Sequence, residues 1–382
     1  MPRSALTLNE LAKVRSDNRK ILDADAGNQG TALGLKNYLP GGVRTGQPCI
    51  IVYVPYKLNE DMLDPRFRIP KLLTSSDGEL EAPTDVVITT LPEIKGKKPD
   101  LSEQNKKLVA ALRWEDGTLD HLRPGAQIGG YFFPKDAPAA ASAAGDTEIQ
   151  SYMGTVGYVV GETKGPAVGI LTNQHIGIVA GQSIYIPGGK QPSVRVGITR
   201  EVRQHYPDDE WLAGVDEPFA FIKTDAAFVS VEAHFRSKLR NELAEVGRIE
   251  GRYNVDLDTM DVIGLPVQKV GRTTGRTTGV IIAYGYRATH ANDSLDRQMG
   301  KEPANIYTDF LISPDEGFEE FAAHGDSGSG ILTNDGDKLL GLGLLWGGRP
   351  TDFDREEGYK TLAYGINLGR LLDVMGLDLI LS

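Results

Sequence analysis

The pattern of apolar and polar positions divides the chain into two parts of different character. In the first part, residues 7–22 have the spacing of an amphipathic helix, with Thr7 as its cap and Glu10 three residues later. Short apolar runs and a second helical pattern then predict buried strands at 49–54 and 84–91 and a helix at 101–114. Residues 1–121 are therefore expected to form a small α/β domain. Its composition does not disclose whether it serves regulation, docking or assembly.

Beyond residue 122 the pattern changes to many short β-like runs separated by glycines. Regularly spaced short strands of this kind favour a β-barrel or a β-sandwich. The clearest runs lie at 156–160, 168–172, 183–186, 226–231, 279–284, 306–312 and 339–346. A stretch rich in Ala, Ser and Pro at 135–147 is expected to be an exposed loop. Residues 366–376 carry apolar positions on one face of a terminal helix.

Composition narrows the class of protein without assigning a function. The chain has 382 residues, 40% of them hydrophobic and 24% charged, as in a globular protein of two or three domains. Its formal charge of −11 disfavours nucleic acid and anionic membranes as partners, because both repel an acidic protein. Cys49 is the only cysteine, which excludes an internal disulfide and a cysteine-based metal site. No apolar run resembles a signal peptide or has membrane length, so a cytoplasmic location is expected.

The most distinctive stretch is His-Gly-Asp-Ser-Gly-Ser-Gly at 324–330. Glycines allow backbone conformations closed to other residues, so Ser327 can be directed outward while neighbouring N–H groups point the same way. That geometry suits a nucleophilic hydroxyl beside an anion-binding nest. The alternative is an ordinary glycine-rich turn between strands.

A nucleophilic serine needs a base, and the base needs an acid that orients it. His175 directly follows the strand-like run 169–174 and would sit on a rigid support, although a histidine there is often structural. Asp225 leads into an apolar strand with small residues behind it, where it can be buried against an imidazole; the alternative is a turn at a strand start. His324 is too close to Ser327 to act as its base and is expected to line the substrate cleft. The remaining histidines lie in polar or irregular contexts and are expected at the surface: His121, His205, His234 and His290.

These motifs together resemble those of the trypsin-like, chymotrypsin-fold serine peptidases. Gly-Asp-Ser-Gly at 325–328 resembles the nucleophile motif of that family, Leu-Thr-Asn-Gln-His at 171–175 its bacterial histidine motif, and Asp-Ala-Ala-Phe at 225–228 its aspartate motif. Residues 270–279 resemble a Gly-Thr hairpin found in a bacterial and plant branch. With the α/β prefix, this suggests the branch that includes the plant narrow-leaf protein. The resemblance covers residues 122–382.

The resemblance implies a fold and a set of roles. The expected fold is mainly β. Two packed antiparallel six-stranded barrels, at about 150–245 and 260–365, follow the α/β domain in the sequence. A serine endopeptidase is implied, in which Ser327 attacks the peptide carbonyl, His175 transfers the proton and Asp225 orients the imidazole. The N–H groups of Gly325 and Ser327 would form the oxyanion hole.

The resemblance also implies a substrate pocket, a partner and no cofactor. Phe321 would lie at the pocket floor, with further substrate contacts from His324, Leu344, Trp346 and Gly347. No carboxylate occupies the floor, so an apolar, shallow pocket is expected; cleavage only after Arg or Lys would contradict this. The partner would be a protein or peptide, no metal or other cofactor is expected, and assembly into a homo-oligomer stays open. No activation site supplies a new N-terminus for Asp326, which suggests an enzyme that is competent from the start or one gated by the α/β domain or the 135–147 loop.

Three other interpretations are available. The first is a catalytically silent binding module on the same fold, which the presence of all three triad residues disfavours. The second is a phosphate loop at 271–279, which lacks the required spacing and its lysine. The third is a metal site at Asp256, Asp258 and Asp261, where no glycine or distal glutamate completes a calcium loop.

Overall fold

A computed structural model gives the structure of the chain. It describes residues 5–23, 28–37, 44–54, 63, 68–88, 101–113, 121–132, 150–186, 194–207, 220–288, 305–318, 320–351 and 360–381. The loop expected at 135–147 lies outside the described residues. No helix in the described ranges is long and apolar enough to span a membrane.

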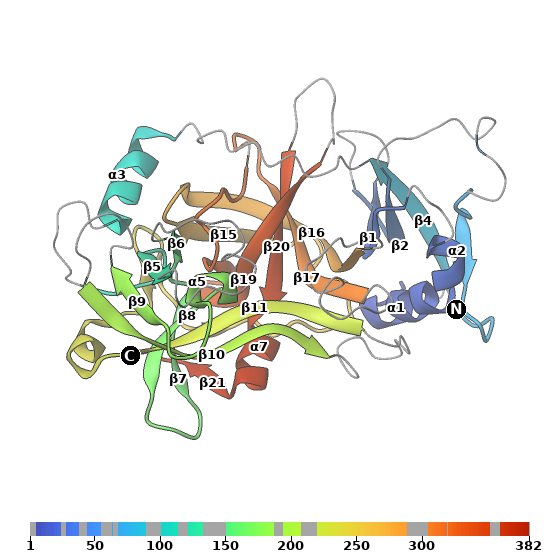
Figure 1. Cartoon of the computed structure of the whole chain (residues 1–382). Coiled ribbons are helices and arrows are strands. Elements are labelled where there is room, and N and C mark those ends of the chain that lie inside the picture. The colour runs from blue at the N-terminus through green and yellow to red at the C-terminus, as the bar shows by residue number, and fades with distance from the viewer. Residues whose placement is uncertain are drawn as a thin grey trace.

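The N-terminal segment forms a small sheet covered by two short helices (Figure 1). Helix α1 (Leu8–Asp17) begins with the predicted capping box, because Thr7 Oγ1 accepts from the Glu10 N–H and the Glu10 carboxylate accepts from the Thr7 N–H. The other elements are α2 (Arg19–Asp23), β1 (Gly30–Asn37), β2 (Arg44–Val54), β3 (Leu72–Thr74), β4 (Glu81–Ile88) and α3 (Glu103–Leu112). No strand is predicted from the sequence where β1 lies, because residues 26–48 are rich in glycine and turn residues.

Seven strand segments form the first barrel: β5 (Gln127–Phe132), β6 (Gln150–Thr155), β7 (Tyr158–Glu162), β8 (Val168–Thr172), β9 (Ser183–Ile186), β10 (Val194–Pro207) and β11 (Ala220–Val231). Two residues separate β6 from β7, so these segments act as one bent strand. Antiparallel pairing then runs in a closed ring from β5 through β6–β7, β8, β11, β10 and β9 back to β5. Its interior holds a separate apolar cluster that includes Ile128, Val159, Ile170 and Val229.

The second barrel is a closed ring of six antiparallel strands: β15 (Pro266–Gly271), β16 (Gly275–Ala288), β17 (Asn305–Pro314), β20 (Lys360–Asn367), β19 (Lys338–Thr351) and β18 (Gly330–Asp335). The N-terminal sheet is continuous with this barrel, because β1 pairs with β16 as well as with β2. The predicted fold class is confirmed: the chain is mainly β, with antiparallel barrels of the chymotrypsin type.

Several contacts join the two barrels. Strands β11 and β17 pair in parallel, and the buried Tyr158 hydroxyl lies 2.7 Å from the Ile331 carbonyl oxygen and 2.8 Å from that of Gly343. The predicted terminal helix is α7 (Leu368–Met375), which ends where Gly376 adopts φ 61°. Strand β21 (Leu377–Leu379) then pairs with β7, so the chain end returns to the first barrel. The remaining elements are short: α5 (Gln174–Gly177), a 3₁₀ helix (Ala233–Lys238), β12 (Glu242–Leu243), β13 (Gly247–Arg248) and β14 (Gly251–Arg252).

Candidate active site

His175 and Asp225 meet in the first barrel: His175 lies on α5, directly after β8, and Asp225 lies near the middle of β11. The His175 Nδ1 atom lies 2.7 Å from Asp225 Oδ2, and the His175 backbone N–H donates to Oδ1 at 3.1 Å. The carboxylate is 5% exposed and the imidazole 43% exposed. Because Asp225 occupies Nδ1, the neutral ring carries its proton there and leaves Nε2 as the acceptor. The predicted pairing of these two side chains is therefore present.

The backbone at Asp225 is held in an unusual conformation. Its φ is 38°, in the left-handed region that non-glycine residues enter at a cost of about 1–3 kcal/mol. The Asn173 side-chain amide donates to the Asp225 carbonyl oxygen at 2.8 Å. This hydrogen bond ties the turn before His175 to the bend in β11. The pair is thus positioned by two neighbouring strands of one barrel.

Ser327 lies in a glycine-rich turn that precedes β18. Gly325 and Gly328 adopt φ values of 102° and 90°, which glycine reaches at low cost. The Ser327 carbonyl oxygen accepts from Thr155 N–H at 2.9 Å, and a Cβ at Gly328 would lie only 3.2 Å from the Asn173 nitrogen. Ser327 is therefore placed beside the turn that carries His175.

No direct hydrogen bond joins the side chains of His175 and Ser327. The His175 imidazole and the Ser327 hydroxyl, both described, form no hydrogen bond with each other. Catalytic hydrogen bonds are often long in enzymes without substrate. Within the described part of the chain, the N–H groups of Gly325 and Ser327 donate to no protein oxygen. Both donors are available to an anion, as the predicted oxyanion hole requires.

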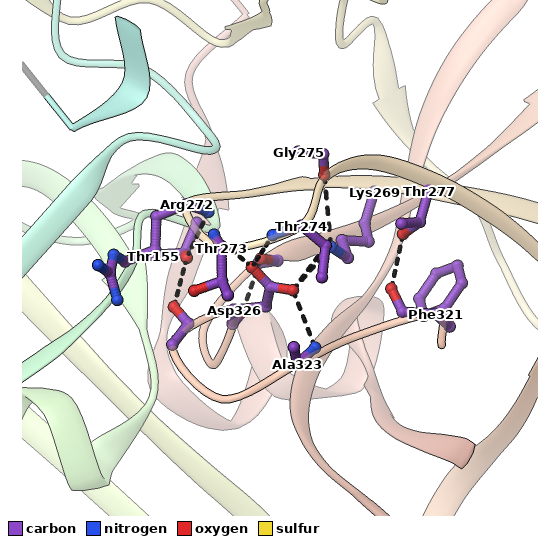
Figure 2. Close-up of polar contacts among 12 residues, drawn as sticks. Thr155, Lys269, Arg272, Thr273, Thr274, Gly275, Thr277, Phe321, Ala323 and Asp326 are labelled. Atoms are coloured by element: carbon purple, nitrogen blue, oxygen red, sulfur yellow. Dashed lines mark hydrogen bonds and ion pairs between the residues drawn. The ribbon is translucent and has the colours of Figure 1, made fainter. Parts of the chain in front are cut away.

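A buried ion pair fixes Asp326, between those two donors (Figure 2). Lys269 Nζ lies 2.9 Å from Asp326 Oδ2, and neither side chain has exposed surface. The carboxylate also accepts from the N–H groups of Thr273, Thr274 and Ala323 at 2.8, 3.2 and 3.0 Å, and from Thr274 Oγ1 at 2.7 Å. Lys269 Nζ contacts Thr274 Oγ1 as well. Both oxygens of the Asp326 carboxylate therefore accept hydrogen bonds from within the protein.

Burial and charge act in opposite directions on this pair. Burial alone would raise the pKa of Asp326, but the Lys269 charge and the hydrogen bonds outweigh it and hold the pKa below its usual value. Burial lowers the pKa of Lys269, and the charge of Asp326 offsets only part of that effect. The carboxylate thus stays ionised and anchors the loop.

Threonine side chains hold the carbonyls of the same loop. Thr273 Oγ1 donates to the His324 carbonyl oxygen at 3.0 Å, and Thr155 Oγ1 donates to that of Gly325 at 2.9 Å. With both carbonyls engaged from the hairpin and from the first barrel, the peptide planes around Gly325 are fixed.

The predicted substrate-contacting residues occupy different environments. His324 is exposed, and Trp346 and Gly347 are partly exposed on β19. Trp346 Nε1 donates to Thr308 Oγ1 at 2.9 Å, which orients the ring. Phe321 and Leu344, in contrast, have no exposed surface and pack in the large apolar core that includes side chains of the second barrel. Neither side chain is accessible in this arrangement, and their contact with substrate stays a prediction.

The sequence reasoning missed Lys269 and its threonine partners. The available signal was a single lysine between Gln268 and Val270 in the strand at 266–271, the only charged residue of that strand. A buried lysine requires a partner charge. Asp326 was a candidate for that partner, because no activation site supplies a new N-terminus to pair with it.

The two barrels and the His175–Asp225 pair beside Ser327 define a protein of the chymotrypsin fold. Within that class, the chain belongs to the Narrow Leaf 1 family. Residues 3–87 match the NARROW LEAF 1 N-terminal domain, and residues 138–382 match the Nal1 C-terminal domain.

Comparison with individual proteins agrees with this assignment. Protein NARROW LEAF 1 of Oryza sativa subsp. japonica is 28% identical over 399 residues, a match that covers 99% of this chain and 61% of the relative. The chain therefore spans less than two thirds of that relative. Among solved structures, Nocardiopsis protease matches at 20% identity and a TM-score of 0.37, over 59% of this chain and 92% of that one. A glutamic acid-specific serine protease is 15% identical, with a TM-score of 0.41 over 68% of this chain and 100% of that one.

Proposed function

We propose that this protein is a serine endopeptidase that cleaves proteins or peptides through Ser327, His175 and Asp225. The observation that carries the proposal is the 2.7 Å contact between His175 and Asp225, beside a serine whose neighbouring N–H groups have no protein acceptor. A purely structural role for His175 would not account for the two N–H groups, of Gly325 and Ser327, that have no protein acceptor.

The proposed reaction follows from the orientation of these groups. Ser327 Oγ bonds to the carbonyl carbon while His175 Nε2 takes the hydroxyl proton, and the N–H groups of Gly325 and Ser327 receive the oxyanion. The tetrahedral intermediate collapses as its C–N bond breaks, and His175 gives the proton to the leaving amine. Water, activated by His175, then releases the acyl group from Ser327. Asp225 keeps the tautomer and stabilises the imidazolium in both halves.

The proposed enzyme needs no cleavage to become competent. Lys269 supplies from within β15 the positive charge that holds Asp326. Restraint of access, by narrow substrate choice or by the N-terminal segment, would then be what limits activity. Because the chain is acidic and has a single cysteine, we propose a cytoplasmic location and no nucleic acid or membrane partner.

A peptide-library digestion read by mass spectrometry tests the proposal. Ser327→Ala and His175→Ala should each lower the cleavage rate by roughly 10⁴-fold or more, because triad members act as a unit. The matched controls are Ser237→Ala and His234→Ala, which alter exposed residues of the 3₁₀ helix and should leave the rate unchanged. Absence of cleavage by the intact protein, or cleavage that survives both triad substitutions, would contradict the proposal. The first result would favour a silent binding module.

A further inference from the structure

The guanidinium of Arg272 lies against the loop that carries the proposed oxyanion hole. A Cβ added to Gly325 would stand 2.5 Å from Arg272 Nη1, so the cation directly covers the Gly325 α-carbon. Arg272 follows β15 and is only partly buried. Figure 2 shows its side chain directed away from the Lys269–Asp326 pair. Arg272 is therefore a separate positive charge beside the reaction centre.

Contacts from two other parts of the chain fix the position of Arg272. Its Nε donates to Gln127 Oε1 at 2.8 Å, which sets the plane of the guanidinium and leaves the Nη atoms available. Arg113, at the end of α3, donates from Nε to the Arg272 carbonyl oxygen at 3.1 Å. Helix α3 is itself held on the hairpin by Asn105, which bonds the backbone N–H and carbonyl of Arg276. The N-terminal segment thus delivers a second guanidinium to the same place.

The two cations form no ion pair within the described part of the chain. Asp326 is the described carboxylate that influences Arg272, and Lys269 already engages it. Burial lowers the pKa of Arg272, and the nearby Arg113 charge lowers it further. An incoming anion would supply a counter-charge that opposes both effects. The cluster is therefore suited to a carboxylate.

The positions of β19 and Arg272 along the loop that carries Ser327 indicate which part of a substrate would contact these cations. Gly328 N–H donates to the Leu345 carbonyl oxygen at 3.0 Å, so β19 borders Ser327 on one side. Arg272 borders the loop at Gly325, which precedes Ser327 in the chain, whereas the β19 contact is made at Gly328, which follows it. If the acyl part of a peptide runs along Trp346 and Gly347 of β19, its leaving-group part is the part that would contact Arg272.

We infer that Arg272, assisted by Arg113, forms a subsite that binds an Asp or Glu side chain within the first two residues after the scissile bond. This inference rests on the proposed endopeptidase function and specifies its substrate class. The bidentate geometry of a guanidinium matches a carboxylate, and such charge-assisted bonds are strong where solvent is partly excluded. The subsite explains why α3 is attached to the hairpin that supports the oxyanion loop.

Matched quenched peptides test the subsite. Each would carry the best sequence from the library digestion, with Glu or Gln at the first or second position after the cleavage site and with an amidated C-terminus. Wild-type kcat/KM should favour the Glu peptide by about tenfold at one of these positions. Arg272→Gln should bring the ratio to near one, Arg113→Gln should reduce it, and Arg272→Glu should reverse it toward a Lys peptide. Arg276→Gln, at an exposed arginine of the same hairpin, is the control and should keep the wild-type ratio.

The possible results separate the subsite from the function on which it rests. Equal cleavage of Glu and Gln peptides by the wild type, or a preference that Arg272→Gln preserves, would overturn the subsite and leave the endopeptidase intact. Failure of the wild type to cleave any peptide would contradict the proposed function and the subsite with it.

Discussion

Replacing Lys269 with methionine removes one partner of the buried ion pair while keeping the length of the side chain. Asp326 would remain without solvent exposure and without its counter-charge. Deleting one partner of a buried pair usually costs about 3–5 kcal/mol of the free energy of unfolding. Asp326 keeps four other donors, namely the N–H groups of Thr273, Thr274 and Ala323 and the Thr274 hydroxyl. The loss should therefore lie near the lower end, about 3 kcal/mol, or roughly 150-fold in the folding equilibrium.

The consequence of that loss should be concentrated in the oxyanion loop. Asp326 lies between the two proposed donors, so any shift of its carboxylate turns the peptide planes of Gly325 and Ser327. Lys269→Met should then slow covalent labelling of Ser327 under conditions in which the variant is folded. A shift confined to global stability would leave the labelling rate unchanged.

Urea unfolding and labelling rates, measured together, provide the assay. Arg287→Met is the matched control, because Arg287 is also a buried cation in an ion pair. It lies near the end of β16 and donates to the two carboxylate oxygens of Asp23 at 2.9 and 2.8 Å. The control should lose stability without a change in labelling. A Lys269→Met protein that is as stable as the wild type, or one that is labelled at the wild-type rate, would refute this account of the pair.

Three further predictions concern the frame of the molecule. Gly328→Ala should cost about 3 kcal/mol in urea unfolding, because φ is 90° and the new methyl would meet a backbone oxygen at 2.5 Å; an unchanged midpoint would contradict this. Thr7→Ala should cost about 1 kcal/mol through loss of the capping box, and equal stability would show that the cap is dispensable. Partial burial alone would raise the pKa of Asp23, but its bonds to Arg287 hold that pKa below the usual value. The stability that Asp23 contributes is therefore present above about pH 4 and lost as the pH falls through the folded pKa. Wild type and Asp23→Asn should then converge in stability as the solution is acidified; a constant difference would refute the assignment.

Elements that depend on residues close together in the sequence could be predicted from the sequence pattern. The capping box at Thr7 and Glu10 follows from two side chains three residues apart, and the structure forms it. The β runs near 168–172 and 226–231 are strands because their apolar residues fill one barrel. The pairing of His175 with Asp225 could be predicted because each residue adjoins a strand and the two strands, β8 and β11, are neighbours.

Features that depend on distant partners could not be predicted in this way. Strand β1 pairs with β16, more than 240 residues away, and its glycines hide it in a segment that resembles turns. Lys269 was missed because its partner lies 57 residues along the chain. The resemblance placed Phe321 at the floor of a substrate pocket; its side chain has no exposed surface, and its contact with substrate stays a prediction. Spacing along a sequence gives no information about which side of a loop faces the interior.

Reaction with a fluorophosphonate tests the central claim most directly. We expect one adduct per intact chain, located at Ser327 by peptide mass mapping and abolished in both Ser327→Ala and His175→Ala. Exposed Ser237 should remain unmodified and serves as an internal control. An intact, folded protein that is not labelled, or an adduct that persists in His175→Ala at the wild-type rate, would contradict the claim that these residues form an active nucleophile.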